Sequence, residues 1–225
     1  MIDELSAAAL ARMIDISAVQ AFHTLDDVTE LARVAVQRKF VAAHVLPNFV
    51  THLRQQLAGS ETMTGAPVGF PSGGSSTRVK VTEARELIES GVDEMDLMIS
   101  LGRLRSGDYS YVLNEIRAVV DAAAPAPVKV ILELHYLSDD QIKRGCELCI
   151  QAGADFVKTA TGWAPSGATL KRVELITRFV HSAIKVKASG GIRDFETVEL
   201  MWRMGVQRFG INTAAAISIL AGCRT

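Results

Sequence analysis

The sequence predicts an α/β protein folded as a (β/α)8 barrel, the TIM-barrel architecture, with a short extra helix at its N-terminus. Short apolar runs alternate with longer amphipathic segments, there are eight such runs, and the 225 residues divide into units of about 28 residues. An open, doubly wound parallel sheet is the alternative. We favour the barrel because no dinucleotide-binding glycine pattern follows the first apolar run.

Each apolar run is short enough to be one strand, and the segments between them repeat apolar residues at the three- and four-residue spacing of a helix. The predicted strands are residues 12–17, 41–46, 66–70, 94–100, 128–134, 155–159, 184–189 and 207–212. The predicted helices are residues 3–11, which lie outside the barrel repeat, and residues 28–39, 77–90, 111–124, 138–153, 170–180 and 194–205.

Polar residues and glycines mark the ends of these helices. Ser138 and Asp194 stand where a helix should begin, because their short side chains can accept a hydrogen bond from the first turn. Gly91, Gly153 and Gly205 stand where helices should end before the next strand. The sequence therefore predicts a recurring junction of helix, glycine and strand.

The composition indicates a globular protein, with 48% hydrophobic and 22% charged residues. The net charge of -1 predicts no broad surface for nucleic acid or an acidic membrane, so any anion site must be local. No apolar run approaches the roughly 18 residues that span a bilayer, and acids stand where a secretory signal carries bases. We expect a cytoplasmic protein with one barrel domain over residues 1–225, because no linker divides the chain.

Lysines at strand ends are the first candidate functional residues. The active site of a (β/α)8 barrel gathers at the C-terminal ends of its strands. Only Lys158 and Lys187 of the eight lysines lie late in predicted strands, and these are the neighbouring sixth and seventh strands. The other six are expected to be solvated on helices (Lys39, Lys80, Lys143, Lys171) or to lie at strand beginnings, the face of the barrel that serves stability (Lys129, Lys185).

Two adjacent lysines in one apolar cavity can produce a nucleophile. An amine of ordinary pKa, about 10.4, is neutral in only about one molecule in 2,500 at pH 7. A second cation about 4 Å away disfavours the ammonium by about 4 kcal/mol at an effective dielectric constant near 20, and burial adds to this. One lysine can then be activated for Schiff-base formation with a carbonyl. The alternative is that one or both lysines only pair with a carboxylate.

Asp96 is the third member of this group, because it lies within the apolar run of the fourth strand. A buried carboxylate without a partner is costly, so we expect Asp96 to face the lysines as a counter-ion or proton carrier. A purely structural salt bridge is the alternative.

Glycines lie at the ends of the seventh and eighth strands, where (β/α)8 barrels commonly bind phosphate with backbone N–H groups and a helix N-terminus. Ordinary turns are the alternative explanation. The residues expected to form this phosphate site are Ser189, Gly190, Gly191, Gly210, Asn212 and Thr213.

Four stretches, VGFPSGGSSTRVKVTEA, DEMDLMISLGRLRSGDY, GADFVKTATGW and KASGGIRD, resemble deoxyribose-phosphate aldolases, a class I aldolase family. The resemblance runs from about residue 12 to residue 220. It implies that Lys158 forms the Schiff base, that Lys187 lowers its pKa, and that Asp96 belongs to a proton relay.

The resemblance also implies the reaction, which is reversible cleavage of 2-deoxy-D-ribose 5-phosphate to acetaldehyde and D-glyceraldehyde 3-phosphate through an enamine. It implies no metal, no organic cofactor, and a homo-oligomer, either dimer or tetramer. Further substrate-binding residues implied by it are Ser17, Thr159, Thr161 and Gly162.

Several pocket positions depart from the family pattern, whereas both lysines and Asp96 are retained. The departures are Ser17 for threonine, His44 for cysteine, Leu134 and His135 beside Glu133, Ala160 for serine, and Asn212 with Thr213 for two serines. Together with Trp163, these residues are expected to shape the pocket. They leave open a Schiff-base aldolase with a different sugar phosphate or an unphosphorylated aldehyde, a non-catalytic sugar-phosphate binder, and a metal enzyme using His44, Glu133 and His135.

Overall fold

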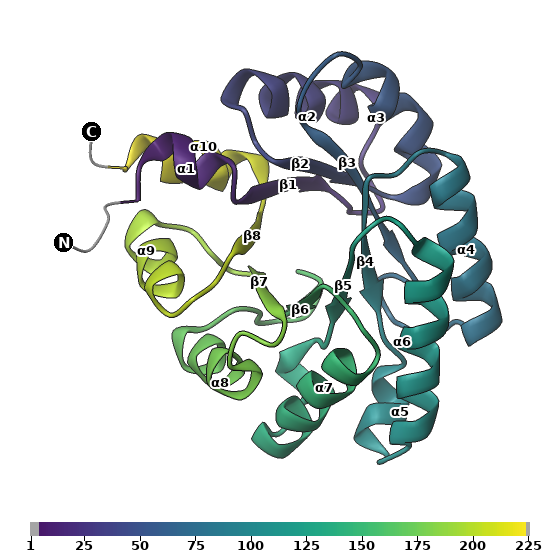
Figure 1. Ribbon diagram of the computed structural model, residues 1–225. Helices are drawn as coiled ribbons and strands as arrows, with labels where there is room; N and C mark the ends of the chain where they lie inside the picture. Colours follow the sequence, from purple (N-terminus) through teal and green to yellow (C-terminus); the bar gives the residue numbers. More distant parts are fainter. Residues whose placement is uncertain (1–4, 224–225) are drawn as a thin grey trace.

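A computed structural model describes residues 5–223 of the chain. Its eight strands are all parallel and form a closed barrel in chain order, with the last strand pairing with the first (Figure 1). The predicted TIM barrel is therefore confirmed. The strands are β1 Ile14–Ala18, β2 Ala42–Val45, β3 Met63–Val68, β4 Glu94–Met98, β5 Val128–Ile131, β6 Phe156–Lys158, β7 Lys185–Ser189 and β8 Arg208–Ile211.

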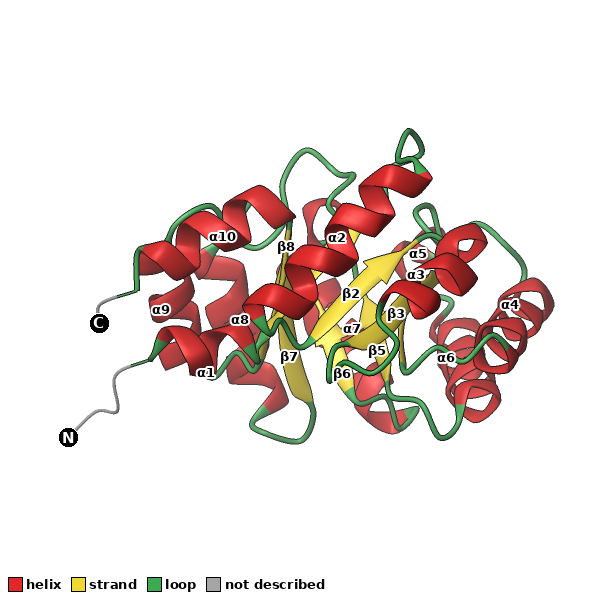
Figure 2. Cartoon of the chain, turned by 90° about the horizontal axis from the view of Figure 1, so that it is seen from above, coloured by secondary structure: helices red, strands yellow, loops and turns green. Residues whose placement is uncertain are grey.

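Helices surround the barrel and cover the outer face of its sheet (Figure 2). The predicted extra N-terminal helix, α1, lies beside the last helix, α10 (Figure 1). The helices are α1 Ala7–Ala11, α2 Leu25–Arg38, α3 Val50–Gln56, α4 Thr77–Glu89, α5 Leu101–Arg105, α6 Tyr109–Ala123, α7 Asp139–Gln151, α8 Leu170–Val180, α9 Phe195–Arg203 and α10 Thr213–Ala221, with 3-10 turns η1 Pro47–Phe49 and η2 Leu134–Tyr136.

Several predicted boundaries were wrong. The first helix begins at Ala7 and not at residue 3, because Ser6 is its N-cap; residues 3 and 4 lie outside the described part of the chain. The third strand runs over Met63–Val68 instead of residues 66–70, and it ends where Gly69 takes a φ of 66°. The fourth and fifth predicted strands were too long, since their apolar residues continue into buried loops.

The predicted helix ends are confirmed. Ser138 and Asp194 are the N-caps of α7 and α9, and each accepts a backbone hydrogen bond from the first turn. Gly91, Gly153 and Gly205 follow α4, α7 and α9 with φ values of 80°, 77° and 99°. That left-handed conformation costs glycine little, which is why the sequence carries glycine at these junctions.

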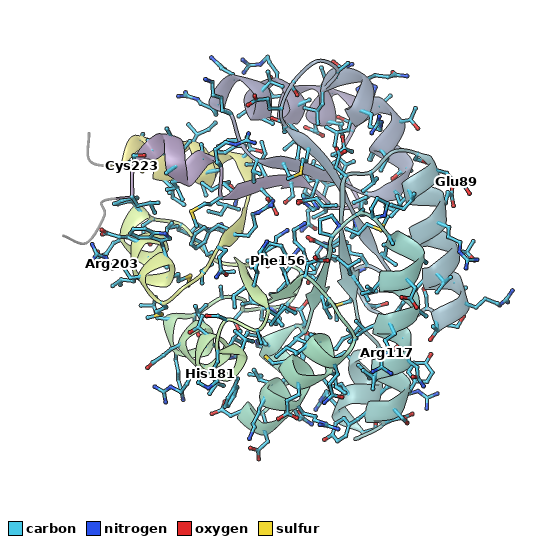
Figure 3. All side chains as sticks on the ribbon, viewed as in Figure 1. Glu89, Arg117, Phe156, His181, Arg203 and Cys223 are labelled. Carbon is cyan, nitrogen blue, oxygen red and sulfur yellow. The ribbon has the colours of Figure 1, made fainter. Side chains whose placement is uncertain are left out.

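The barrel interior is filled by charged side chains, whereas the apolar core lies between the sheet and the helices. Alternate residues of a strand point to the same face, so Glu94 and Asp96 both point inward. Phe156 lies in the middle of the barrel, as Figure 3 shows, and its ring centroid is within 5.9 Å of Lys129 Nζ. The interior is thus a packed charge network that opens at one end.

Two lysines differ from their sequence predictions. Lys80 on α4 was expected to be solvated, but it is fully buried, and its Nζ lies 2.8 Å from Glu115 Oε1 on α6. Lys129, expected to serve only stability at a strand start, is buried in the interior with its Nζ 2.7 Å from Glu94 Oε1. No helix within residues 5–223 is long and apolar enough to cross a membrane.

Candidate active site

A cavity of about 320 Å³ opens at the C-terminal end of the barrel strands, above the charge network. Most of the residues predicted from the sequence border it, including both lysines and the aspartate. The predicted residues that line the cavity are Ser17, His44, Asp96, Lys158, Thr161, Gly162, Lys187, Ser189, Gly190, Gly191, Gly210 and Asn212.

Lys158 is the last residue of β6 and is a buried lysine of the cavity wall, only 7% exposed. Its Nζ donates a hydrogen bond to Asp96 Oδ2 at 2.6 Å. Burial lowers the pKa of Lys158 to about 8, because a buried ammonium loses hydration; Asp96 opposes this shift and the Lys187 charge adds to it. At pH 7 about one molecule in ten then carries a neutral amine.

Lys187 is the neighbouring cation, one strand along on β7. Its Nζ lies 2.7 Å from Asp15 Oδ2 and 2.8 Å from Asp96 Oδ2. Burial acts to lower the pKa of Lys187, but the charges of Asp15, Asp96 and Glu94 outweigh it and raise the pKa. Lys187 therefore stays an ammonium while Lys158 titrates.

Asp96 accepts hydrogen bonds from both amines through the same oxygen, Oδ2. Burial alone would raise its pKa, yet the charges of Lys158 and Lys187 hold the pKa of Asp96 well below its usual range. The expected position of Asp96 facing both lysines is thus observed, and the group is a carboxylate at neutral pH.

Glu94, Lys129 and Arg208 extend the network deeper into the barrel, and they were not predicted as part of the site. Glu94 Oε1 lies 2.7 Å from Lys129 Nζ and 2.8 Å from His44 Nε2. Arg208 Nη1 lies 2.5 Å from Asp15 Oδ1 and 3.2 Å from Glu94 Oε2. With this part included, four cationic side chains face three carboxylates, so neutral Lys158 brings the network to charge balance.

Residues that border the cavity but were missed include Asp15 and Arg193. Asp15 had a signal, because it is an acid inside an apolar strand, as Asp96 is. Arg193 had a weaker signal, since it lies two residues after Gly191 in the segment that follows the seventh strand. The remaining cavity residues without a sequence prediction are Val19, Gln20, His23, Pro67, Phe70, Ile192 and Ile211.

Several predicted residues stand behind the cavity wall. Thr159 Oγ1 donates to Ser189 O and accepts from Ser189 N, both at 2.8 Å, which joins β6 to β7. Ala160 is buried, and its carbonyl accepts from Ser189 Oγ. Thr213 is the first residue of α10 and is not among the cavity residues.

The other four, Glu133, Leu134, His135 and Trp163, also lie outside the lining, and Leu134 is fully buried. The Glu133 carboxylate accepts from the backbone N–H and the hydroxyl of Thr161. His135 Nδ1 lies 2.7 Å from Ser166 Oγ. Trp163 is 43% exposed and packs edge to face on a cavity residue, Phe70.

These positions do not assemble the metal site that the sequence left open, because Glu133 and His135 bind other side chains away from His44. Within residues 5–223, the residues that could ligate one ion are Asp15, His44 and Glu94, whose ligand atoms lie within 4.8 Å of one another. Ammonium and guanidinium groups already pair with both carboxylates. This donor set suits cationic side chains better than an added dication.

Two glycines after β7 and one within β8 leave space at the cavity. Gly190 and Gly191 have φ values of 88° and 87°, a conformation that favours glycine. A Cβ on Gly210 would lie 2.9 Å from Ser189 Cβ and 3.3 Å from Lys187 Cε, so glycine here makes room for the Lys187 side chain. Asn212 is the N-cap of α10.

Comparisons with known proteins agree with the motifs and the geometry. Residues 8–215 match the DeoC/LacD family of aldolases. The deoxyribose-phosphate aldolase of Sinorhizobium medicae is 55% identical over 215 residues, which are 95% of this chain and 87% of that protein. The chain belongs to the deoxyribose-phosphate aldolase family. Another aldolase of this family, from Klebsiella pneumoniae, is 46% identical over 94% of this chain and 86% of its own length.

Solved structures related to the deoxyribose-phosphate aldolase family have the same fold. A crystal structure from Coccidioides immitis has a TM-score of 0.93 at 34% identity and covers 97% of this chain and 87% of that chain. The deoxyribose phosphate aldolase of Aeropyrum pernix, described as tetrameric, has a TM-score of 0.86 at 31% identity, with 96% of this chain and 91% of that chain covered. The resemblance that the motifs predicted is therefore confirmed.

Proposed function

We propose that the protein is a class I aldolase that reversibly cleaves 2-deoxy-D-ribose 5-phosphate to acetaldehyde and D-glyceraldehyde 3-phosphate. The observation that carries the proposal is a buried amine of lowered pKa, Lys158, at the cavity wall within hydrogen-bond distance of Asp96. Membership in the deoxyribose-phosphate aldolase family supports the same reaction.

Lys158 is the nucleophile of this mechanism. Its neutral amine attacks the substrate aldehyde, and loss of water leaves an iminium ion. The iminium at C1 draws electrons from the C2–C3 bond, which breaks as the C3 hydroxyl loses its proton. D-glyceraldehyde 3-phosphate leaves, and the enamine on Lys158 is protonated and hydrolysed to acetaldehyde.

Lys187 and Asp96 set the charge of this nucleophile. The fixed ammonium of Lys187 disfavours a second ammonium on Lys158, which favours the reactive neutral amine. Asp96 orients both amines through one oxygen and offers a path for protons between them.

The phosphate of the substrate is proposed to bind beside β7 and β8. Backbone N–H groups at Gly190 and Gly191, the Arg193 side chain and the N-terminal end of α10 at Asn212 border this part of the cavity. Arg193 supplies a positive charge on a protein whose net charge is only -1.

A second candidate keeps the Schiff base and changes the sugar. Three of the departures from the family pattern, Ser17, His44 and Asn212, border the cavity. A panel of phosphorylated and unphosphorylated aldehydes separates the two candidates. Efficient cleavage of deoxyribose 5-phosphate, with weak turnover of every other sugar, excludes the second.

The direct test combines turnover with trapping. We expect deoxyribose 5-phosphate to be cleaved, and borohydride added with substrate to fix a mass adduct that peptide mapping assigns to Lys158. Lys158→Met removes both signals, and a chelator changes neither. An adduct on another lysine, or none with any aldehyde, contradicts the proposal.

We also propose a homo-oligomer, either a dimer or a tetramer. Phe22 and Leu25 are 77% and 53% exposed beside the start of α2, and a related aldolase is described as tetrameric. Light scattering of the purified protein tests this, and a monomer at micromolar concentration contradicts it.

A further inference from the structure

His44 has one ring nitrogen engaged and one free. Nε2 lies 2.8 Å from Glu94 Oε1, whereas Nδ1 has no hydrogen-bond partner among residues 5–223 although it is buried. The charge of Lys129 and the hydrogen bond from His44 hold the pKa of Glu94 well below its usual range despite burial. Glu94 is thus an acceptor, so Nε2 carries the hydrogen and Nδ1 of the neutral ring has a lone pair.

The free nitrogen faces the carboxylate that holds the reactive amine. His44 Nδ1 lies 3.6 Å from Asp96 Oδ2, and the same oxygen lies 2.6 Å from Lys158 Nζ. Two acceptors at 3.6 Å form no hydrogen bond, but a proton on Nδ1 would create a charge-assisted bond to Asp96. Asp96 Oδ2 thus lies between Lys158 and an empty proton acceptor.

The ring is held in this position from two sides. Glu94 fixes Nε2, and the backbone of Gly65 on β3 lies directly against the ring. A Cβ on Gly65 would lie 2.3 Å from His44 Nε2 and Cε1, so only glycine leaves room for the imidazole there. The protein thus keeps a histidine that borders the cavity in one orientation.

Schiff-base formation creates a need for such an acceptor. Lys158 has a pKa of about 8, so at pH 7 most molecules carry an ammonium that must lose a proton before it attacks a carbonyl. Asp96 holds that proton poorly, because its pKa lies well below its usual range. Burial acts to raise the pKa of Asp96, but the charges of Lys158 and Lys187 outweigh that effect.

We propose that His44 is a positioning and proton-storing residue for Schiff-base formation: Nδ1 receives the Lys158 proton through Asp96 Oδ2 and later returns it to the departing hydroxyl. This inference rests on the proposed function, because it needs Lys158 to attack an aldehyde. It adds His44 to the group formed by Lys158, Lys187 and Asp96.

The step balances in protons and bonds. The Lys158 ammonium gives one proton to His44, and the neutral amine forms a C–N bond as the carbonyl π pair moves to oxygen. That oxygen takes a proton from the attached nitrogen and becomes a hydroxyl. The stored proton then returns to the hydroxyl, the C–O bond breaks, water leaves, and the iminium remains.

The charges around His44 suit a transient store. Burial and the charge of Lys187 lower the pKa of His44, while Asp96, Glu94 and Asp15 act to raise it. The lowered pKa keeps the resting ring neutral and able to accept, and the three carboxylates stabilise the imidazolium while it lasts.

The test measures iminium formation by borohydride quench with acetaldehyde in single-turnover experiments from pH 6 to 9.5. His44→Gln keeps an amide near Glu94 and removes the titrating Nδ1, and His44→Asn serves as the second variant if the first folds poorly. His52→Gln is the matched control, because His52 lies on α3, where its Nε2 contacts Thr29 Oγ1 at 2.8 Å.

We expect His44→Gln to slow iminium formation about 100-fold at pH 7, with the deficit shrinking above pH 8, where Lys158 has already lost its proton. His52→Gln should follow the wild type at every pH. A wild-type rate in the His44 variants, or a loss equal at all pH values, overturns the inference. Absence of any Lys158 adduct in the wild type overturns the proposed function instead.

Discussion

Within residues 5–223, two regions bury a lysine against a carboxylate, and one of them faces the candidate active-site cavity. Outside the sheet, Lys80 Nζ lies 2.8 Å from Glu115 Oε1, and Ser100 donates its backbone N–H and hydroxyl to the same carboxylate. Inside the barrel, Lys158 Nζ lies 2.6 Å from Asp96 Oδ2. The two ion pairs are alike in distance and burial, so neither property separates them.

The surrounding charges make the difference. Lys80 and Glu115 are matched one to one and closed off from the cavity. Lys158 shares Asp96 with Lys187, in a network where cations outnumber carboxylates. Burial of a lysine therefore does not by itself give a reactive amine. A surplus of positive charge and access to substrate are also needed.

The largest expected effect on activity comes from replacing Lys158 by methionine. Lys158→Met removes the nucleophile, so we expect deoxyribose 5-phosphate cleavage to fall by a factor of about 1,000 or more. The variant should remain folded, because methionine fills the space without a buried charge. Cleavage assays with circular dichroism test this, and residual turnover above about a tenth of wild type contradicts it.

The second prediction removes the surplus charge. Lys187→Met removes the neighbouring cation, and Asp96 then pairs with Lys158 without competition from Lys187. Both changes raise the pKa of Lys158 from about 8. If that pKa returns to about 10, the neutral fraction and the rate at pH 7 fall about 100-fold, and the loss is recovered at high pH.

Lys185→Met is the matched control, because Lys185 begins the same strand but is exposed. It should keep the wild-type pH profile of cleavage. If the pH profile of cleavage by Lys187→Met has its inflection at the same pH as that of the wild type, the second cation does not set the pKa of Lys158.

The third prediction concerns the helix-layer pair. Lys80→Met leaves the carboxylate of Glu115 buried without its cation, which should lower the free energy of unfolding by about 3–5 kcal/mol. The double variant Lys80→Met, Glu115→Leu should recover most of the loss. Urea denaturation measures both, and activity per folded molecule should stay at wild type. A loss below about 1 kcal/mol would make this pair no better than a surface ion pair.

The sequence predicted the barrel and the central site because both depend on local pattern. Eight alternating runs require a parallel sheet, and polar residues late in strands led to Lys158, Lys187 and Asp96, which the structure brings together. Glu94 was missed because it was assigned to the strand beginning, although its spacing of two from Asp96 puts both on one face.

Lys80 was mispredicted for a similar reason. It shares a helix face with the buried Ala84 and Leu87, at spacings of four and seven, which is the pattern of an inward-facing position. The prediction that Lys80 is exposed to solvent rested on its charge alone. Its partner Glu115 lies on another helix, 35 residues along the chain, and helical spacing within α4 gives no information about that contact.

The most direct measurement of the central claim is the pH dependence of Lys158 labelling. Borohydride trapping with a simple aldehyde, followed by peptide mapping, reports the neutral fraction of each lysine separately. The lowered pKa predicts that Lys158 labelling rises about tenfold from pH 7 to pH 9 and levels off above an inflection near 8, while Lys80 stays unlabelled. An inflection above pH 10, or equal labelling of both lysines, would contradict the account.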